Sequence, residues 1–152
     1  MSDYRFVTIW NIDAPLEAVW KLIEDADSWP EWWQGVLSVT KIEAGDRDGI
    51  GSIRRTLWKS ALPYKLEFDS KVIRIERLKL IEARAFGELD GHGLWQFFPE
   101  SDTRTRVQYD WQVKTTKAWM NVLAPIARPF FRWNHDTIMA WGEQGLKRQL
   151  GI

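Results

Sequence analysis

The amino-acid sequence predicts an α+β fold, in which a seven-stranded antiparallel sheet wraps around a long C-terminal helix and two short helices follow the first strand. Three observations predict it: a strand-like segment opens the chain, six strand-like segments joined by short turns fill its middle, and a helical segment ends it. Strands joined by short turns pair antiparallel. Because 152 residues, 45% of them hydrophobic, suffice for one core, we expect residues 1–152 to form a single domain.

The first strand and the first helix follow from residue type and spacing. Residues 4–12 (YRFVTIWNI) are rich in aromatic and β-branched side chains, as strands are. Asp13 stands where a helix cap is expected and Pro15 just inside it, so we predict a helix over residues 15–24. The segment 27–35 (DSWPEWWQG) predicts one more helical turn.

Turn-forming residues divide the middle of the chain. The turns are GDRDGIG (45–51), ALP (61–63), LDGHG (89–93) and PESDT (99–103). The strands predicted around them are 36–44, 51–59, 64–77, 80–89, 93–98 and 104–114.

The C-terminal section, residues 117–150, is helical in composition. A single helix of that length would be about 51 Å long and would overhang the globule. Because proline removes a helical hydrogen bond and clashes with the preceding turn, we expect breaks at Pro125 and Pro129. With Pro129 in its first turn, the remaining helix is about 33 Å long and covers the concave face of the sheet.

Composition and missing motifs exclude several functions. Lys plus Arg and Asp plus Glu both number 21, so the formal net charge is zero, which argues against nucleic-acid binding. The absence of cysteine excludes disulfides and thiolate chemistry. Neither histidine has a partner at metal-ligand spacing, and the GxSxG, P-loop and GxGxxG motifs are missing, so we expect no metal and no cofactor. No apolar stretch reaches 18 residues and no secretory signal opens the chain, so we expect a cytoplasmic protein of unknown oligomeric state.

The aromatic content stands apart, with 11 Trp, 7 Phe and 3 Tyr. Each such side chain buries about 150–250 Å². Two interpretations remain open: an aromatic-rich core, or aromatic walls around a ligand cavity.

Asn134 lies in the middle of an apolar helix face. On a wheel of 100° per residue, Trp141, Ile138, Phe130 and Gly145 fall within about 40° of it. An unpaired buried amide costs about 1–3 kcal/mol, so we expect a partner. That partner is either sheet backbone or water, or a polar group of a ligand.

The two histidines have simpler interpretations. His135, about 100° from Asn134 on the wheel, is either a structural residue at the edge of the core or a proton-transfer group. His92, in the turn LDGHG, is predicted to lie at the surface.

Strand alternation predicts which side chains point inward. Tyr109 and Trp111 share an apolar face with Val107, and Tyr64 and Phe68 share one with Leu66. For residues 51–59 the pattern does not tell which face is inward.

An even number of loop residues in the hairpin at 89–93 would place four side chains on one inner face: Arg84, Phe86, Trp95 and Phe97. An odd number would turn Arg84 outward and bring Ala83 and Ala85 inward. An inward Arg84 could hold an oxyanion or enolate.

Four stretches carry a resemblance to a known family: IDAPLEAVWKLIEDADSWPEWW (12–33), GDRDGIGSIRRTLWKSALPYKLEF (45–68), GELDGHGLWQF (87–97) and RPFFRWNHDTIMAWGEQGL (128–146). They resemble the SRPBCC, or START-like, superfamily with its helix-grip fold, which includes the birch pollen allergens, and most specifically its bacterial polyketide cyclase/dehydrase type. None of the four is a catalytic motif. The resemblance implies an internal hydrophobic cavity, and members of the superfamily include cyclases, aromatases and lipid carriers.

These observations lead to two hypotheses of function. In the first, the protein binds a hydrophobic or polycyclic aromatic small molecule and, if it is an enzyme, catalyses intramolecular aldol condensation or dehydration with Asn134, Arg84 and Tyr64. The expected ligand-binding residues are Phe68, Phe86, Trp95, Phe97, Tyr109, Trp111, Phe130, Asn134, Ile138 and Trp141. In the second, it is a non-catalytic lipid or isoprenoid carrier in transient contact with a membrane, since AWMNVLAPIARPFFRW (118–133) suits either a membrane interface or core packing.

Overall fold

The computed structural model describes residues 3–60, 62–115 and 124–152. Their elements follow in the order β1 (Asp3–Ile12), α1 (Leu16–Glu24), η1 (Ala26–Ser28), α2 (Trp29–Trp32), β2 (Val36–Glu43), β3 (Ile53–Lys59), β4 (Lys65–Glu76), β5 (Leu80–Gly87), β6 (Leu89–Ser101), β7 (Arg104–Thr115) and α4 (Ala124–Leu150).

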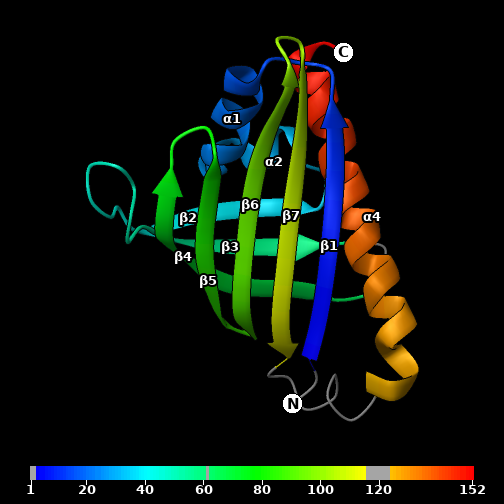
Figure 1. Ribbon diagram of the computed structural model, residues 1–152. Helices are drawn as coiled ribbons and strands as arrows, with labels where there is room; N and C mark the ends of the chain where they lie inside the picture. The colour runs from blue at the N-terminus through cyan, green and yellow to red at the C-terminus, as the bar shows by residue number, and fades with distance from the viewer. Residues whose placement is uncertain (1–2, 61, 116–123) are drawn as a thin grey trace.

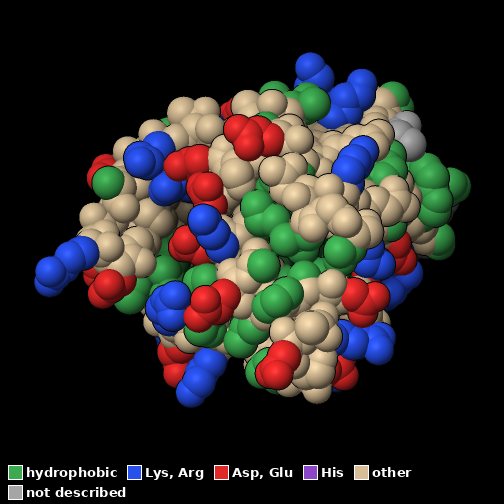
Figure 2. Space-filling view, turned by 90° about the horizontal axis from the view of Figure 1, so that it is seen from above, with side chains coloured by type: hydrophobic (Ala, Val, Ile, Leu, Met, Phe, Trp, Pro, Cys, Tyr) green, Lys and Arg blue, Asp and Glu red, His purple; other side chains and the backbone are tan. Residues whose placement is uncertain are grey.

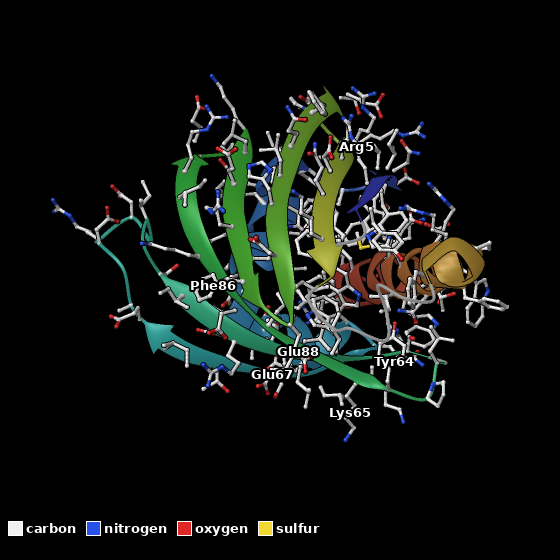
Figure 3. The ribbon with its side chains drawn as sticks, turned by 90° about the horizontal axis from the view of Figure 1, so that it is seen from below. Arg5, Tyr64, Lys65, Glu67, Phe86 and Glu88 are labelled. Atoms are coloured by element: carbon white, nitrogen blue, oxygen red, sulfur yellow. The ribbon has the colours of Figure 1, made fainter. Side chains whose placement is uncertain are left out.

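All seven strands form one antiparallel sheet in the order β1-β7-β6-β5-β4-β3-β2. The sheet is strongly curved: β6, β7 and β1 run side by side, while β2 and β3 cross behind them (Figure 1). Seen from below, the strands form an arc whose open side is occupied by α4 (Figure 3). The predicted α+β architecture is therefore confirmed, with its two short helices after β1 and its long C-terminal helix.

Strict alternation in β1 explains how the sheet presents one apolar face to the helix. Tyr4, Phe6 and Trp10 are each at most 6% exposed, whereas Val7 and Ile9 between them are about half exposed. The inner row of β1 therefore belongs to the core, and its outer row faces solvent.

Two predicted boundaries differ from the structure. Helix α1 begins at Leu16 with Pro15 as its N-cap and no side-chain cap, so the prediction that Asp13 caps it was wrong. The β5–β6 turn lies at Glu88, and all of the predicted turn LDGHG (89–93) is part of strand β6. Two of these strand positions require glycine, because neighbouring atoms leave no room for a Cβ. A Cβ on Gly91 would clash with the Gln112 carbonyl, and a Cβ on Gly93 would clash with the Tyr109 hydroxyl.

The C-terminal helix is longer than predicted. α4 runs from Ala124 to Leu150 with Pro129 inside it, so Pro129 is not in the first turn. Pro129 removes only the bond to the carbonyl four residues earlier, and the 27 residues of α4 give a length of about 40 Å. The expected start at residue 117 lies outside the described residues.

The core has two parts, which α4 joins. We call the first the packed end; it is built around Trp10, Ile12, Trp20, Trp32 and Leu146, beside α1 and α2. We call the second the hollow end; it is built around Tyr4, Phe6, Phe68, Trp111 and Phe131.

Charged side chains are mixed on the surface. On the face seen from above, acidic and basic groups are interspersed around hydrophobic ones, and neither sign forms a continuous patch (Figure 2). No helix among the described residues is long and apolar enough to cross a membrane.

Candidate functional site

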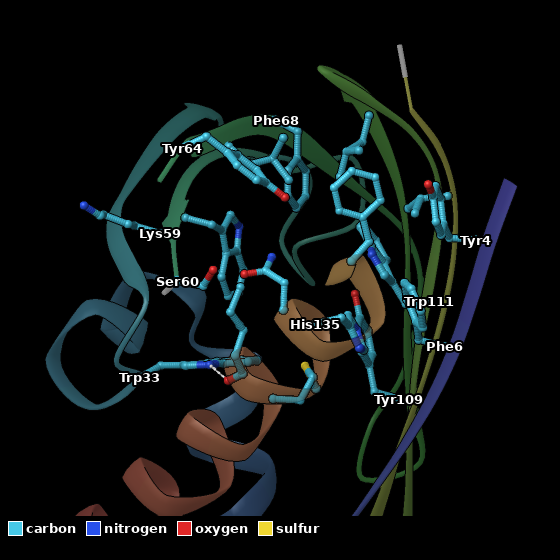
Figure 4. A pocket seen from close by; sticks show the side chains of 18 of the residues that line it. Tyr4, Phe6, Trp33, Lys59, Ser60, Tyr64, Phe68, Tyr109, Trp111 and His135 are labelled. Carbon is cyan, nitrogen blue, oxygen red and sulfur yellow. Dashed lines mark hydrogen bonds between the residues drawn. The ribbon is translucent and has the colours of Figure 1, made fainter. Parts of the chain in front are cut away.

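A cavity of about 120 Å³ lies at the hollow end between α4 and the concave face of the sheet (Figure 4). Most of its wall is aromatic. The aromatic lining residues are Tyr4, Phe6, Trp29, Trp33, Trp58, Tyr64, Phe68, Trp95, Tyr109, Trp111 and Phe131. The exposed Lys59 side chain points away from the cavity beside Ser60, which marks where the cavity reaches solvent (Figure 4).

The wall from β3 and β4 is fixed by a short chain of hydrogen bonds. The Trp58 indole N–H donates to Thr56 Oγ1 over 2.8 Å, and the Thr56 hydroxyl donates to the Phe68 carbonyl over 3.3 Å. The Trp58 and Phe68 rings lie parallel, with centroids 6.3 Å apart. Thr56 and Trp58 therefore face inward, which answers the question that alternation left open for residues 51–59.

Trp33 forms the boundary between the cavity and the packed end. Its indole N–H donates to the Ile138 carbonyl of α4 over 2.9 Å (Figure 4). Its ring lies 5.4 Å from that of Trp10 and 5.2 Å from that of Trp58, nearly perpendicular to the latter. This hydrogen bond fixes α4 to Trp33 at the wall that separates the cavity from the packed end.

Three polar side chains of the cavity contain buried atoms with no hydrogen-bond partner among the described residues. These atoms are the Tyr4 hydroxyl, Asn134 Oδ1 and both ring nitrogens of His135. A buried polar atom without a partner costs about 1–3 kcal/mol. A ligand with matching polar groups would remove that cost, so these atoms mark where its polar part would lie.

His135 is held in an apolar environment as a neutral imidazole. Its side chain is 13% exposed and stacks on the Phe6 ring at a centroid distance of 4.5 Å. Burial lowers the pKa of His135 to about 4, and the nearby Arg132 guanidinium acts in the same direction, while Asp136 opposes both. At neutral pH the ring is therefore uncharged and can accept a hydrogen bond at one nitrogen.

The tyrosines of the cavity remain protonated. Burial raises the pKa of Tyr64 to about 12, and it also raises the pKa of Tyr109 and of Tyr4 above the ordinary value. Their hydroxyls therefore act as hydrogen-bond donors across the physiological range.

The structure brings together most of the residues predicted for the site. The predicted residues that line the cavity are Tyr64, Phe68, Trp95, Tyr109, Trp111, Asn134 and Ile138. They come from β4, β6, β7 and α4 and from the segment before β4. Their roles in binding or catalysis stay predictions.

Arg84 and Phe86 are on the other face of the sheet. The last β5–β6 pair before the turn is Ala85 with Gly91, which leaves an odd number of residues between them and turns Arg84 outward. Arg84 is 62% exposed and lies 3.9 Å from Asp90, and Phe86 is 40% exposed. The placement of both in the cavity was wrong, and Ala85 is buried in their stead.

Three other predicted ligand-binding residues lie elsewhere. Phe97 packs edge-on against Trp20 at the packed end, with centroids 4.9 Å apart. Trp141 also packs there, and Phe130 is 58% exposed. The inward helix positions are Phe131, Asn134, His135, Ile138, Met139, Gly142, Gly145 and Leu146.

The centre of that inward face lies roughly 70° from Asn134, toward His135. A face centred on Asn134 includes Phe130 and Trp141, which do not line the cavity, and leaves out Gly142 and Leu146, which point inward. His135, predicted on the flank, is therefore a central lining residue. His92 lies on β6 opposite Arg84 and contacts Glu82 on the outer face.

Several lining residues were missed. Tyr4 and Phe6 could have been found from the alternation in YRFVTIW, as could Phe131 from a better-centred helix face. Trp29 begins the short helix α2 and Trp33 directly follows its end, where no periodicity shows their direction. Among the described residues, no cluster of three or more His, Asp or Glu could hold a metal ion.

Comparisons with known proteins agree with this geometry. Solved structures with the same fold include the Zhui aromatase/cyclase from Streptomyces sp. R1128, with a TM-score of 0.80, 15% identity, and coverage of 97% of this chain and 93% of that one. They also include a START superfamily protein from Mycobacterium smegmatis (0.77, 14%, 95% of each chain) and norcoclaurine synthase from Thalictrum flavum (0.65, 11%, 99% and 98%).

At these identities the structures show the fold alone, and a search of curated proteins gives no match. The family model described as "Polyketide cyclase / dehydrase and lipid transport" matches residues 12–140. The chain therefore belongs to the polyketide cyclase/dehydrase and lipid transport family.

Proposed function

We propose that the protein binds a neutral, hydrophobic small molecule with an aromatic or cyclisable ring system in the cavity beneath α4. The observation that carries this proposal is the unpartnered Asn134 Oδ1 in an otherwise aromatic cavity. Apolar walls with a few convergent polar groups are typical of ligand sites. Membership in the family supports a hydrophobic ligand.

The volume of the cavity limits what lies fully inside it. A dry cavity of about 150 Å³ accommodates benzene, and this one measures about 120 Å³. The enclosed part therefore holds at most one ring. A polycyclic ligand would extend its remaining rings toward the opening beside Lys59 and Ser60.

The cavity suits intramolecular aldol condensation or dehydration, and the description of its family names cyclases and dehydrases. Apolar walls would fold a flexible chain so that its reacting carbons meet. The Tyr64 hydroxyl and the Asn134 amide would stabilise developing enolate charge by hydrogen bonds. Arg84, on the outer face, takes no part.

Calorimetric titration with 1-naphthol tests the binding. The change is Asn134→Leu, which removes the polar atom from the wall and keeps its size; Arg84→Leu is the matched control on the outer face. We expect the wild type and Arg84→Leu to bind alike and Asn134→Leu to lose roughly tenfold in affinity. Equal binding by all three proteins would exclude Asn134 as the ligand's polar contact. No binding to the wild type would argue against the proposed function itself.

Catalysis has a separate test. We expect the protein to accelerate cyclisation of a linear poly-β-ketone thioester, and expect Asn134→Leu and Tyr64→Phe to reduce the rate by at least tenfold. If the thioester binds but cyclises only at the uncatalysed rate, the protein is a ligand carrier and not a cyclase.

A second candidate, a lipid carrier that collects its ligand at a membrane, is favoured by one observation. Phe130 and Trp133 are 58% and 50% exposed, one helical turn apart, and Arg128 and Arg132 on the same part of α4 are exposed too. Aromatic side chains beside basic ones suit an anionic membrane interface. Residues 118–123 of the predicted interfacial stretch lie outside the described part of the chain. Co-sedimentation with phosphatidylserine vesicles, lost in Trp133→Ser, would support this role, and no sedimentation would remove it.

A further inference from the structure

We infer that His135 accepts a hydrogen bond from a ligand hydroxyl, so that the cavity selects neutral phenols or enols. This inference rests on the proposed function and names its substrate class. It concerns a residue that lies centrally on the inward face of α4 and that the aldol chemistry above does not yet use.

The orientation of His135 leaves one nitrogen for a ligand. Phe6 stacks against one face of the ring, and the Arg132 guanidinium lies over the Phe6 ring at 5.2 Å. Nδ1 is 3.7 Å from Asp136 Oδ1. A carboxylate near one ring nitrogen favours the tautomer with its proton there. The proton is therefore on Nδ1, and Nε2 carries a lone pair that no described residue meets.

The surroundings of His135 decide which ligand form is bound. The charged groups nearest to it are Asp136 and Arg132, both on its own helix. The strands opposite present neutral rings, those of Phe6, Tyr109 and Trp111. The lining residue Lys59 points away from the cavity (Figure 4), so a phenolate or enolate beside the two acceptors would be buried at high cost. The neutral hydroxyl form is favoured, and its O–H donates to Nε2.

The second unpartnered atom sits on the preceding residue. Asn134 Oδ1 is also an acceptor, so the helix presents two acceptors in succession to the cavity. Two acceptors match a ligand with donors better than one with carbonyls alone, because each buried lone pair then meets an O–H. The enol form of a 1,3-diketone and a phenol both supply such a donor.

Paired single-ring probes test the inference without a known substrate. 4-Nitrophenol and 4-nitroanisole have the same ring and differ in the O–H donor. We expect the wild type to bind 4-nitrophenol roughly two- to tenfold more tightly than 4-nitroanisole. On binding near neutral pH, the absorbance of the 4-nitrophenolate form should fall, because the bound form is protonated.

Variants then assign the effect to His135. His135→Phe keeps a ring on Phe6 and removes the acceptor, so the preference for 4-nitrophenol should disappear while 4-nitroanisole still binds. His135→Gln, which keeps an acceptor, should retain part of the preference. A preference unchanged in His135→Phe, or a rise in phenolate absorbance on binding, would overturn the inference. Failure of both probes to bind the wild type would contradict the proposed function.

Discussion

One helix spans two regions of opposite character. At the packed end, a Cβ on Gly142 would lie 2.6 Å from the Trp33 ring, and a Cβ on Gly145 would lie 1.7 Å from the Trp32 carbonyl oxygen. The helix backbone therefore rests directly on α2. At the hollow end the same helix presents Asn134 and His135 across an empty space of about 120 Å³.

The difference shows how the molecule separates stability from binding. Tight contact between glycine backbone and indole rings gives the packed end the dense interior that holds a fold together. The cavity at the hollow end is lined by polar atoms without a hydrogen-bond partner among the described residues, at a cost in stability. The dense packing at the packed end offsets that cost, so α4 stays against the sheet although it covers a cavity at its other end.

Truncating a core ring at each end gives the largest expected effect. Trp10→Ala should lower the free energy of unfolding by about 3–5 kcal/mol, since Trp10 is 2% exposed and its ring contacts Trp33 and Trp95. Phe131→Ala at the cavity wall should cost only about 2 kcal/mol, because a ring beside a void has fewer contacts to lose. Urea denaturation measures both. Equal losses would mean that the two ends are packed alike.

The second prediction concerns pH at the hollow end. The pKa of His135 is lowered from 6.5 to about 4 in the folded protein, so the unfolded chain binds the proton first. The contribution of His135 to the free energy of unfolding is fully present above pH 6.5. It is lost as the pH falls toward 4, by on the order of 3 kcal/mol at most. Denaturation of wild type and His135→Gln across this range isolates the effect. If the free energy of unfolding depends on pH in the same way for both proteins, the pKa of His135 is not lowered by folding.

The third prediction is a reversal of helix propensity at the packed end. Alanine normally stabilises a helix relative to glycine by about 1 kcal/mol. Gly145→Ala should instead destabilise the protein by about 1–3 kcal/mol, because the added methyl overlaps the Trp32 carbonyl. Gln144→Ala, at the exposed neighbouring position, is the control and should change stability by less than about 0.5 kcal/mol. A more stable Gly145→Ala would mean that α4 does not rest on α2.

The smallest expected effect has the opposite sign. Asn134→Leu removes a buried oxygen without a hydrogen bond among the described residues and adds apolar surface, so stability should rise by about 1 kcal/mol. The change in thermal midpoint of the ligand-free protein measures it. Destabilisation would indicate that the amide contributes a structural interaction and not a cost.

Local patterns predicted the fold well because its elements alternate regularly. The inner rows of β1, β4 and β7 follow a period of two, and helix α1 follows helical spacing. The site was predicted less well, because its members depend on distant geometry. Arg84 and Phe86 reversed direction through one residue of loop length. His135 is central because the backbone at Gly142 lies against the Trp33 ring, a contact that no hydrophobic pattern in the sequence shows.

The bond from the Trp33 indole to the Ile138 carbonyl gives the protein an optical reporter of its own. Trp33 lies between the helix that roofs the cavity and three further indoles, those of Trp29, Trp58 and Trp95, whose centroids are 5.1, 5.2 and 6.1 Å away. A ligand that displaces α4 must lengthen the hydrogen bond between Trp33 and Ile138. It thereby changes the polarity around the fluorescent Trp33 indole. Shifts in ultraviolet emission should therefore report occupancy without a label.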